Sequence, residues 1–232
     1  MNSINKTAKM AGALYLVFIV VSIFADTLGR SKIVVFGDAA TTAGNIMASA
    51  WQFRIGSVAD LVAAVLFALT AWALYALLKP VNKNLALLFL VLNLVGVAVW
   101  CFSDLFLIAS QLLLSGSDYL KVFQTDQLES LSMLFLYIHK IGFSGIAQLF
   151  FGAWLFPLGY LIFKSGFLPK FLGIILMVHC VVWLLTTFQF FLFPEFIGRT
   201  FVGMTYLSYP IGFISEFGLS LWLLIKGAKT VA

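Results

Sequence analysis

Charged side chains are scarce in this sequence: only 10% of its 232 residues are Asp, Glu, Lys or Arg. Soluble domains carry about 25% charged residues, so this scarcity, with 62% hydrophobic residues, excludes an ordinary soluble domain. Both cysteines, Cys101 and Cys180, lie in apolar runs, which favours packing over a disulfide framework. There are two histidines and no HExxH, CxxC or phosphate-cradling glycine loop, so we expect no metal site and no cofactor.

Long apolar runs separated by short polar connections make up the rest of the chain. We expect an all-α fold: an integral membrane bundle of six transmembrane helices that forms one domain over residues 1–232. The first run follows Lys6 and Lys9 as a signal peptide would, but we expect it to be a retained helix. The six runs are 11–25, 55–78, 85–114, 128–164, 171–193 and 203–225.

The longest polar connection, 26–53, contains a further helix signal. Asp38 is a favourable N-cap, and residues 39–51 continue with small and apolar side chains. We therefore expect a short external amphipathic helix between the first and second transmembrane helices. Trp51 and Arg54 follow at the level where an aromatic residue usually anchors a span at the membrane surface.

Charge is distributed unevenly between the two sides of the membrane. If both termini are cytoplasmic, the inner segments contain eight lysines and no acidic residue, which satisfies the positive-inside rule. The formal charge of +5 then reflects orientation and attraction to membrane lipids rather than nucleic-acid binding. The inner lysines are Lys6, Lys9, Lys79, Lys83, Lys164, Lys170, Lys226 and Lys229.

Polar and small residues recur every four positions in two of the runs, so each set lies on one helix face. Hydrocarbon does not favour such a stripe, which predicts that each face points into the protein or a water-filled pocket. Counting residues from the inner lysines places most of these groups in the outer half of the membrane. The stripes are Lys140, Ser144, Gln148 and Gly152, and Ser208, Gly212, Glu216 and Ser220.

An outward-facing polar pocket follows from these depths. We expect it between the second, third and fourth helices, covered by residues 38–54, with His179 and Glu216 at its floor. It would bind a small molecule or ion, as in a transporter or sensor. The tentative ligand-binding residues are Asn45, Arg54, Asp60, Asp104, His139, Lys140 and Glu216. Two alternatives stay open: the same residues form a structural ion network in a scaffold, or a polar group serves an enzyme.

The enzyme alternative rests on the motif Gly142-Phe143-Ser144-Gly145. A Gly-x-Ser-Gly motif on the fourth of six helices resembles the rhomboid intramembrane serine proteases. In that family the serine needs a histidine base from the sixth helix, and the run 203–225 contains no histidine. Small residues that permit close helix packing explain the motif as well, so we assign no catalytic residue.

Four motifs spread over the chain resemble one multi-pass membrane family of bacteria, catalogued as domain of unknown function 4386. The resemblance implies a six-span protein of the bacterial cytoplasmic (inner) membrane, and it implies no activity. It leaves the oligomeric state open. The motifs are KMAGALYL at 9–16, GDAATTAGNI at 37–46, FRIG at 53–56 followed by Asp60-Leu61, and FGAWLFPLGY at 151–160 followed by SGFLP at 165–169.

Overall fold

The computed structural model describes residues 3–193 and 205–228, and its regular structure in these ranges is entirely helical. Six helical segments are long and apolar enough to cross a membrane, which confirms the expected six-span bundle. The expected turn at 194–199 and the start of the sixth run at 203–204 lie outside the described residues. The spans are Ile4–Thr27, Ala50–Leu78, Lys83–Leu113, Thr125–Lys164, Lys170–Leu192 and Tyr206–Ile225.

Four of the spans are single helices, and the fourth and sixth are interrupted. The single helices are α1 (Ser3–Gly29), α3 (Ala50–Leu78), α4 (Lys83–Leu113) and α8 (Lys170–Leu192). The fourth span consists of α5 (Thr125–Lys140), the π-helical segment η2 (Ile141–Ala147), α6 (Gln148–Ala153) and α7 (Leu155–Lys164). The sixth consists of α9 (Thr205–Gly212), the π-helical η4 (Phe213–Phe217) and α10 (Gly218–Ile225).

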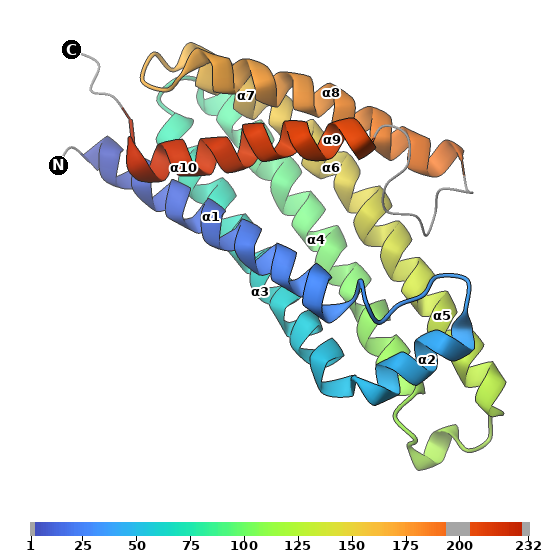
Figure 1. The fold of residues 1–232 in the computed structure, drawn as a ribbon. Coiled ribbons are helices and arrows are strands. Elements are labelled where there is room, and N and C mark those ends of the chain that lie inside the picture. The colour runs from blue at the N-terminus through green and yellow to red at the C-terminus, as the bar shows by residue number, and fades with distance from the viewer. Residues whose placement is uncertain (1–2, 194–204, 229–232) are drawn as a thin grey trace.

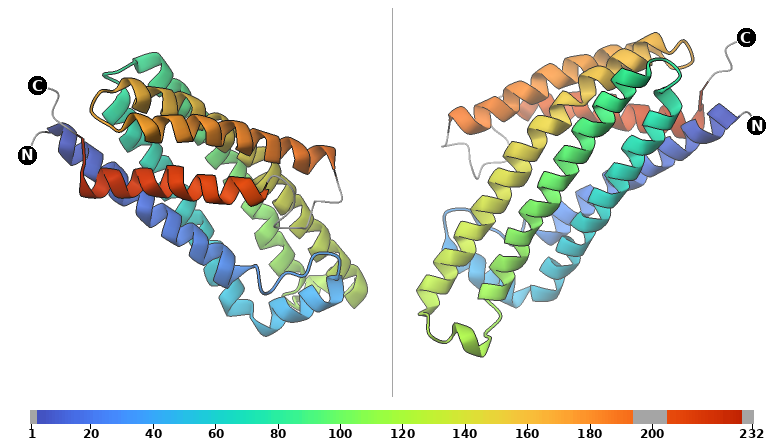
Figure 2. Two further views of the ribbon diagram at one scale, coloured as in Figure 1. Left: turned by 45° about the horizontal axis from the view of Figure 1, so that its top comes forward. Right: turned by 180° about the vertical axis from the view of Figure 1, so that it is seen from behind.

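The spans form a closed ring in chain order, because each packs against the next and α10 returns to pack against α1 (Figure 1). The start of α1 and the end of α10 lie at the same end of the bundle. Toward the other end, α8 and α9 diverge from α3, α4 and α5 (Figures 1 and 2). The short helix α2 (Ala39–Ala48) lies there, against α5 and α3. This divergence leaves space between the two groups of helices.

The amphipathic helix between the first two spans is present but shorter than expected. The carboxylate of Asp38 accepts a hydrogen bond from the Thr41 amide at 2.9 Å, as an N-cap should. The helix ends at Ala48 because Ser49 has φ −120° and ψ 32°, which breaks the helical path. Trp51 therefore belongs to the first turns of α3.

The first two spans pack closely through glycine. A Cβ atom built on Gly56 would lie 2.5 Å from the Cα of Gly29, so neither position has room for a side chain. Small residues let membrane helices approach in this way. Deeper in the bundle, the rings of Tyr15, Phe67 and Trp154 pack together, with Trp154 edge-on to Phe67 at 5.1 Å between centroids. The half of the bundle near the termini is therefore filled by side chains.

The fourth span is about 60 Å long at 1.5 Å per residue, roughly twice the hydrocarbon thickness. Its length predicts that it tilts, breaks or projects beyond the membrane. The observed break falls at Trp154, because Pro157 lacks the amide hydrogen that would bond to the carbonyl oxygen of Ala153. The π segment η2 lies nearer the divergent end, beside the space left by α8 and α9.

Candidate ligand-binding site

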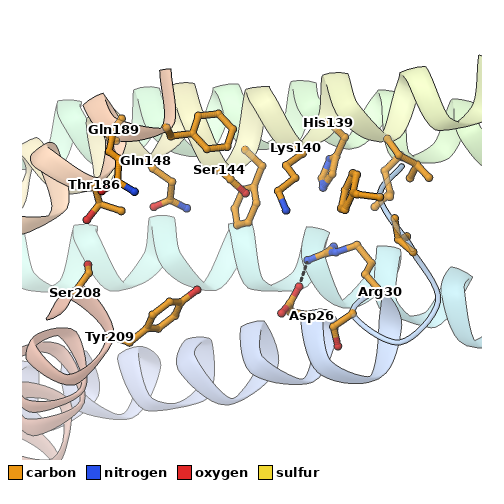
Figure 3. A pocket seen from close by; sticks show the side chains of 18 of the residues that line it. Asp26, Arg30, His139, Lys140, Ser144, Gln148, Thr186, Gln189, Ser208 and Tyr209 are labelled. Atoms are coloured by element: carbon orange, nitrogen blue, oxygen red, sulfur yellow. Dashed lines mark ion pairs between the residues drawn. The ribbon is translucent and has the colours of Figure 1, made fainter. Parts of the chain in front are cut away.

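A cavity of about 400 Å³ occupies the space between the diverging helices (Figure 3). Its walls come from the end of α1, the connection 31–36, the α5–η2–α6 region, α8 and α9. Polar groups from several of these elements reach it: Asp26, Arg30, Ser31, His139, Lys140, Ser144, Gln148, Thr186, Thr187, Gln189, Ser208 and Tyr209. Aromatic rings complete the wall: Phe36, Phe143, Trp183 and Phe190.

Three members of the first polar stripe, Lys140, Ser144 and Gln148, line this cavity. In an ideal α-helix, a spacing of four residues overshoots one turn by about 40°, so a stripe drifts around the helix. The wider i→i+5 turn of η2 compensates for this drift, which keeps the three side chains on the cavity face. The fourth member, Gly152, lies deeper, where a Cβ atom would come 2.7 Å from the Trp183 ring.

Lys140 presents an ammonium group to the cavity. Its Nζ lies 4.3 Å from the centroid of the Phe36 ring, a cation–π contact. Within residues 3–193 and 205–228, no carboxylate lies within ion-pair distance of this nitrogen. Lys140 is thus a cationic side chain in a membrane-spanning helix that contacts an aromatic ring rather than a carboxylate.

His139 lies beside Lys140 and is oriented by α4. Its Nδ1 is 3.2 Å from the carbonyl oxygen of Ser103 and 3.5 Å from Oδ1 of Asp104. Both neighbours are acceptors, so Nδ1 carries the proton and Nε2 is the unprotonated acceptor. The ring stacks on Phe143 at an interplanar angle of 14°. The cavity wall therefore offers a hydrogen-bond acceptor next to the Lys140 ammonium.

Arg30 closes the divergent end of the bundle through a buried ion pair with Asp60. It also approaches Asp26 at 3.6 Å. Burial lowers the pKa of the Arg30 guanidinium from its ordinary value, and the carboxylates of Asp26 and Asp104 oppose that shift. The pair links the end of α1 to Asp60 of α3.

The remaining expected site residues lie away from the cavity wall. Asn45 donates a hydrogen bond from Nδ2 to the carbonyl oxygen of Ile33 at 3.1 Å, which ties α2 to the connection 31–36. Arg54 is exposed on the first turns of α3. Asp104 is buried and faces His139. The structure thus brings together Asp104, His139 and Lys140, but separates them from Arg54, Asn45 and Glu216.

Glu216 belongs to a second polar cluster, deeper in the bundle. The Tyr15 hydroxyl donates to its Oε2, and its Oε1 lies 3.4 Å from Nδ1 of His179. The same Nδ1 is 3.1 Å from Oγ of Ser215. The two members expected at the pocket floor, His179 and Glu216, are therefore in contact, although neither lines the cavity itself.

The walls of the cavity differ from those expected. The second span contributes no lining residue and the third only Leu107, whereas the fifth span contributes five and the first and sixth spans, with the connection after α1, complete the wall. The close Gly29–Gly56 contact leaves no space between the first two spans. The cover is the connection 31–36 rather than 38–54, because α2 packs against α5 beyond the cavity.

Sequence reasoning missed Arg30, Asp26 and Trp183. A signal for the first two was present, since Asp26 and Arg30 are spaced i,i+4 at the end of the first run and pair as that spacing allows. Trp183 had no comparable signal. Its indole nitrogen donates to Oε1 of Gln148 at 3.1 Å, which joins α8 to the stripe of the fourth span.

Two further expectations concern catalysis and metals. Ser144 lines the cavity, but no described histidine hydrogen-bonds to its hydroxyl, and Gly142 of the same motif packs against the Ser103 side chain. Among the described residues, no group of three or more His, Cys, Asp or Glu side chains is placed to hold a metal ion. The geometry thus describes a polar cavity without an assembled nucleophile–base pair.

Six apolar spans around a polar cavity define a multi-pass membrane protein. The chain belongs to the family described as Domain of unknown function (DUF4386), which matches residues 10–227. It is also 28% identical over 160 residues to an uncharacterized protein of the archaeon Archaeoglobus fulgidus, a match that covers 68% of this chain and 75% of that protein. No solved structure matches the chain.

Proposed function

We propose that this membrane protein binds a small molecule carrying an anionic group in the cavity beside Lys140, as a transporter or a sensor would. The observation that carries the proposal is the Lys140 ammonium, which lines the cavity and has no carboxylate partner among the described residues. An unpaired charge within a span is costly, and such residues usually mark a ligand pathway. A bound anion would supply the missing partner.

The other walls favour a ligand with both a polar and an apolar part. Ser144 and Thr186 offer hydroxyl groups, and Gln148, whose Oε1 accepts from Trp183, has an amide NH₂ without a partner in the part of the chain that the structure describes. The rings of Phe143 and Phe190 supply apolar surface. The volume of about 400 Å³ lies within the range of about 300–1,000 Å³ typical of small-molecule sites. A carboxylate or phosphate attached to an apolar, preferably aromatic, body fits this wall.

We also propose that the cavity opens on the outer side of a cytoplasmic membrane. Lys79 and Lys164 lie at the ends of α3 and α7, and the α3–α4 and α7–α8 connections lie at the end of the bundle where α1 begins and α10 ends. By the positive-inside rule this end is cytoplasmic. A reporter active only in the cytoplasm, fused to the C-terminus, should be active. Activity of a reporter that functions only outside would refute this orientation. The bacterial source stays a prediction, because the reported relative is archaeal.

The binding proposal is tested by exchanging one lysine. Lys140→Gln removes the charge but keeps a hydrogen-bonding side chain of similar length. A charge-assisted hydrogen bond contributes about 1.5–3 kcal/mol, so affinity for an anionic ligand should fall about 10- to 100-fold. Lys121→Gln is the matched control, because Lys121 is 74% exposed and outside the cavity.

Two measurements use these variants. Native mass spectrometry of the protein in lipid nanodiscs should show a co-purified small molecule in the wild type and Lys121→Gln, but not in Lys140→Gln. Thermal stabilisation by benzoate should exceed that by its neutral analogue benzamide, and the difference should vanish in Lys140→Gln. Equal responses to both probes in the wild type would contradict the proposal. Covalent labelling of Ser144 by a fluorophosphonate would instead identify an enzyme.

A further inference from the structure

A second polar cluster lies in the membrane interior, where α1, α8 and η4 meet. At its centre is the Glu216 carboxylate. The Tyr15 hydroxyl donates a hydrogen bond to Oε2, and Nδ1 of His179 lies 3.4 Å from Oε1. Tyr15, His179 and Ser215 are completely buried, and the Glu216 side chain is 23% accessible. The cluster shares no residue with the cavity wall.

The charge of this cluster depends on one proton. The titratable groups that face Glu216 are Tyr15 from α1 and His179 from α8, and His179 is the one basic side chain within ion-pair distance among the described residues. No lysine or arginine of residues 3–193 and 205–228 lies within ion-pair distance to fix the carboxylate in its ionised form. An ionised carboxylate beside a neutral imidazole would place an uncompensated negative charge in the membrane. Binding of one proton removes that charge.

His179 is positioned to carry this proton. Its Nδ1 faces the Glu216 carboxylate and the Ser215 hydroxyl, while its Nε2 is buried without a hydrogen-bond partner in the described structure. On that side the ring meets Gly212, where a Cβ atom would lie 3.1 Å from Nε2. Because Nδ1 carries the proton toward Glu216, Nε2 is the unprotonated nitrogen that can accept a second one.

Two helices lead from the cavity to this histidine. Trp183 lies one turn along α8 from His179; it lines the cavity, and its ring packs edge-on against the imidazole at 5.1 Å between centroids. Ser208 lies one turn along α9 from Gly212; it also lines the cavity, and its hydroxyl is buried without a partner among the described residues. His179 is thus about one helical turn from the cavity wall on both sides.

We propose that Glu216 binds and releases a proton inside the membrane, and that His179 transfers this proton between Glu216 and the cavity. A proton from the cavity binds Nε2 of His179, and the proton on Nδ1 passes to Oε1 of Glu216. The imidazole is then neutral again, in its other tautomer, and the carboxylate has become a neutral acid. One proton enters and the charge of the cluster changes from −1 to 0. The reverse sequence releases the proton.

This proposal does not depend on the cavity ligand, so it is tested without any ligand. Infrared difference spectra of the full-length protein in lipid nanodiscs, recorded between two pH values, report protonated carboxyl groups. The pH-dependent carboxyl signal of the wild type should contain a component that is lost in Glu216→Gln and kept in Glu129→Gln, the matched control in α5. Glu216→Asp, which keeps the carboxyl group, should retain a band. An identical band in the wild type and Glu216→Gln would overturn the proposal, as would no band over the stable pH range.

The role of His179 has its own test. In His179→Asn, the side-chain amide occupies the position of Nδ1 and still donates to Glu216, but it cannot accept and pass on a proton. After a rapid pH jump the carboxyl band should reach the same amplitude about 100-fold more slowly. A rate factor of this size is what a positioned general acid–base group typically contributes to proton transfer. An unchanged rate would exclude His179 as the carrier. If no bound ligand depends on Lys140 but proton binding by Glu216 is normal, only the proposed function fails and the proton proposal stands.

Discussion

The buried ion pair between Arg30 and Asp60 supports a quantitative prediction about stability. Their side chains are 12% and 2% exposed, so removal of one partner leaves the other charge buried. Breaking a buried pair in this way costs about 3–5 kcal/mol. Arg30→Met should cost this amount, because Asp60 then has no basic partner within ion-pair distance among the described residues. Asp60→Asn should cost less, since Arg30 keeps Asp26 at 3.6 Å.

The double variant separates charge burial from packing. Arg30→Met combined with Asp60→Leu removes both charges, and replacement of a buried pair by apolar residues is often close to neutral. The double variant should therefore be more stable than Arg30→Met alone, although it contains one more substitution. Reversible unfolding of the wild type, Arg30→Met, Asp60→Leu and the double variant in mixed detergent micelles, followed by circular dichroism, gives the four free energies of the cycle.

An exposed pair provides the control. Lys121 and Asp118 are 74% and 92% exposed and lie 2.6 Å apart, so their removal should cost about 0–1 kcal/mol. One contrary result is that Arg30→Met lowers the free energy of unfolding no more than Lys121→Met does; the other is that the losses caused by the two buried substitutions simply add. Either result would show that the pair does not hold α1 against α3 and would refute the reasoning.

Three further predictions concern the same end of the bundle. Gly56→Leu should destabilise the protein by about 1–3 kcal/mol through overpacking, whereas Gly44→Ala, in open space on α2, should stabilise it by about 0.5–1 kcal/mol in the same unfolding assay. Asn45→Ala should cost about 1 kcal/mol and speed hydrogen exchange in residues 31–36; unchanged exchange would contradict a tie to that segment. Asp38→Ala should destabilise α2 at neutral pH. A backbone hydrogen bond lowers the pKa of Asp38 below its ordinary 3.8, so the difference from wild type should vanish as the pH falls through that lowered value.

The number and type of spans could be predicted because hydrocarbon imposes length and composition on each segment separately. The cavity face of the fourth span could also be predicted, since Lys140, Ser144 and Gln148 are too polar to face lipid. These inferences need only one helix at a time. The π segment itself had no such signal, because its residues are apolar and small like those around it.

The neighbours of each helix could not be predicted in the same way. Periodicity identifies a face but not the helix that it meets, so the cavity was expected between the second, third and fourth spans. Arg54 was expected at the ligand site from its position near the membrane surface, whereas the arginine that reaches Asp60 is Arg30. That pairing depends on the course of the connection 31–36, which no periodic pattern determines.

The two π segments have a consequence for chain length. A π turn closes with an i→i+5 hydrogen bond and so accommodates one residue more than an α turn. Deletion of one residue from 141–147 or 213–217 would therefore convert either segment to regular α-helix while leaving the helix faces on both sides in place. A related chain one residue shorter in either segment would still direct the same side chains inward. In an alignment of two such chains, a single-residue gap in either π segment would keep structurally equivalent positions of that span paired.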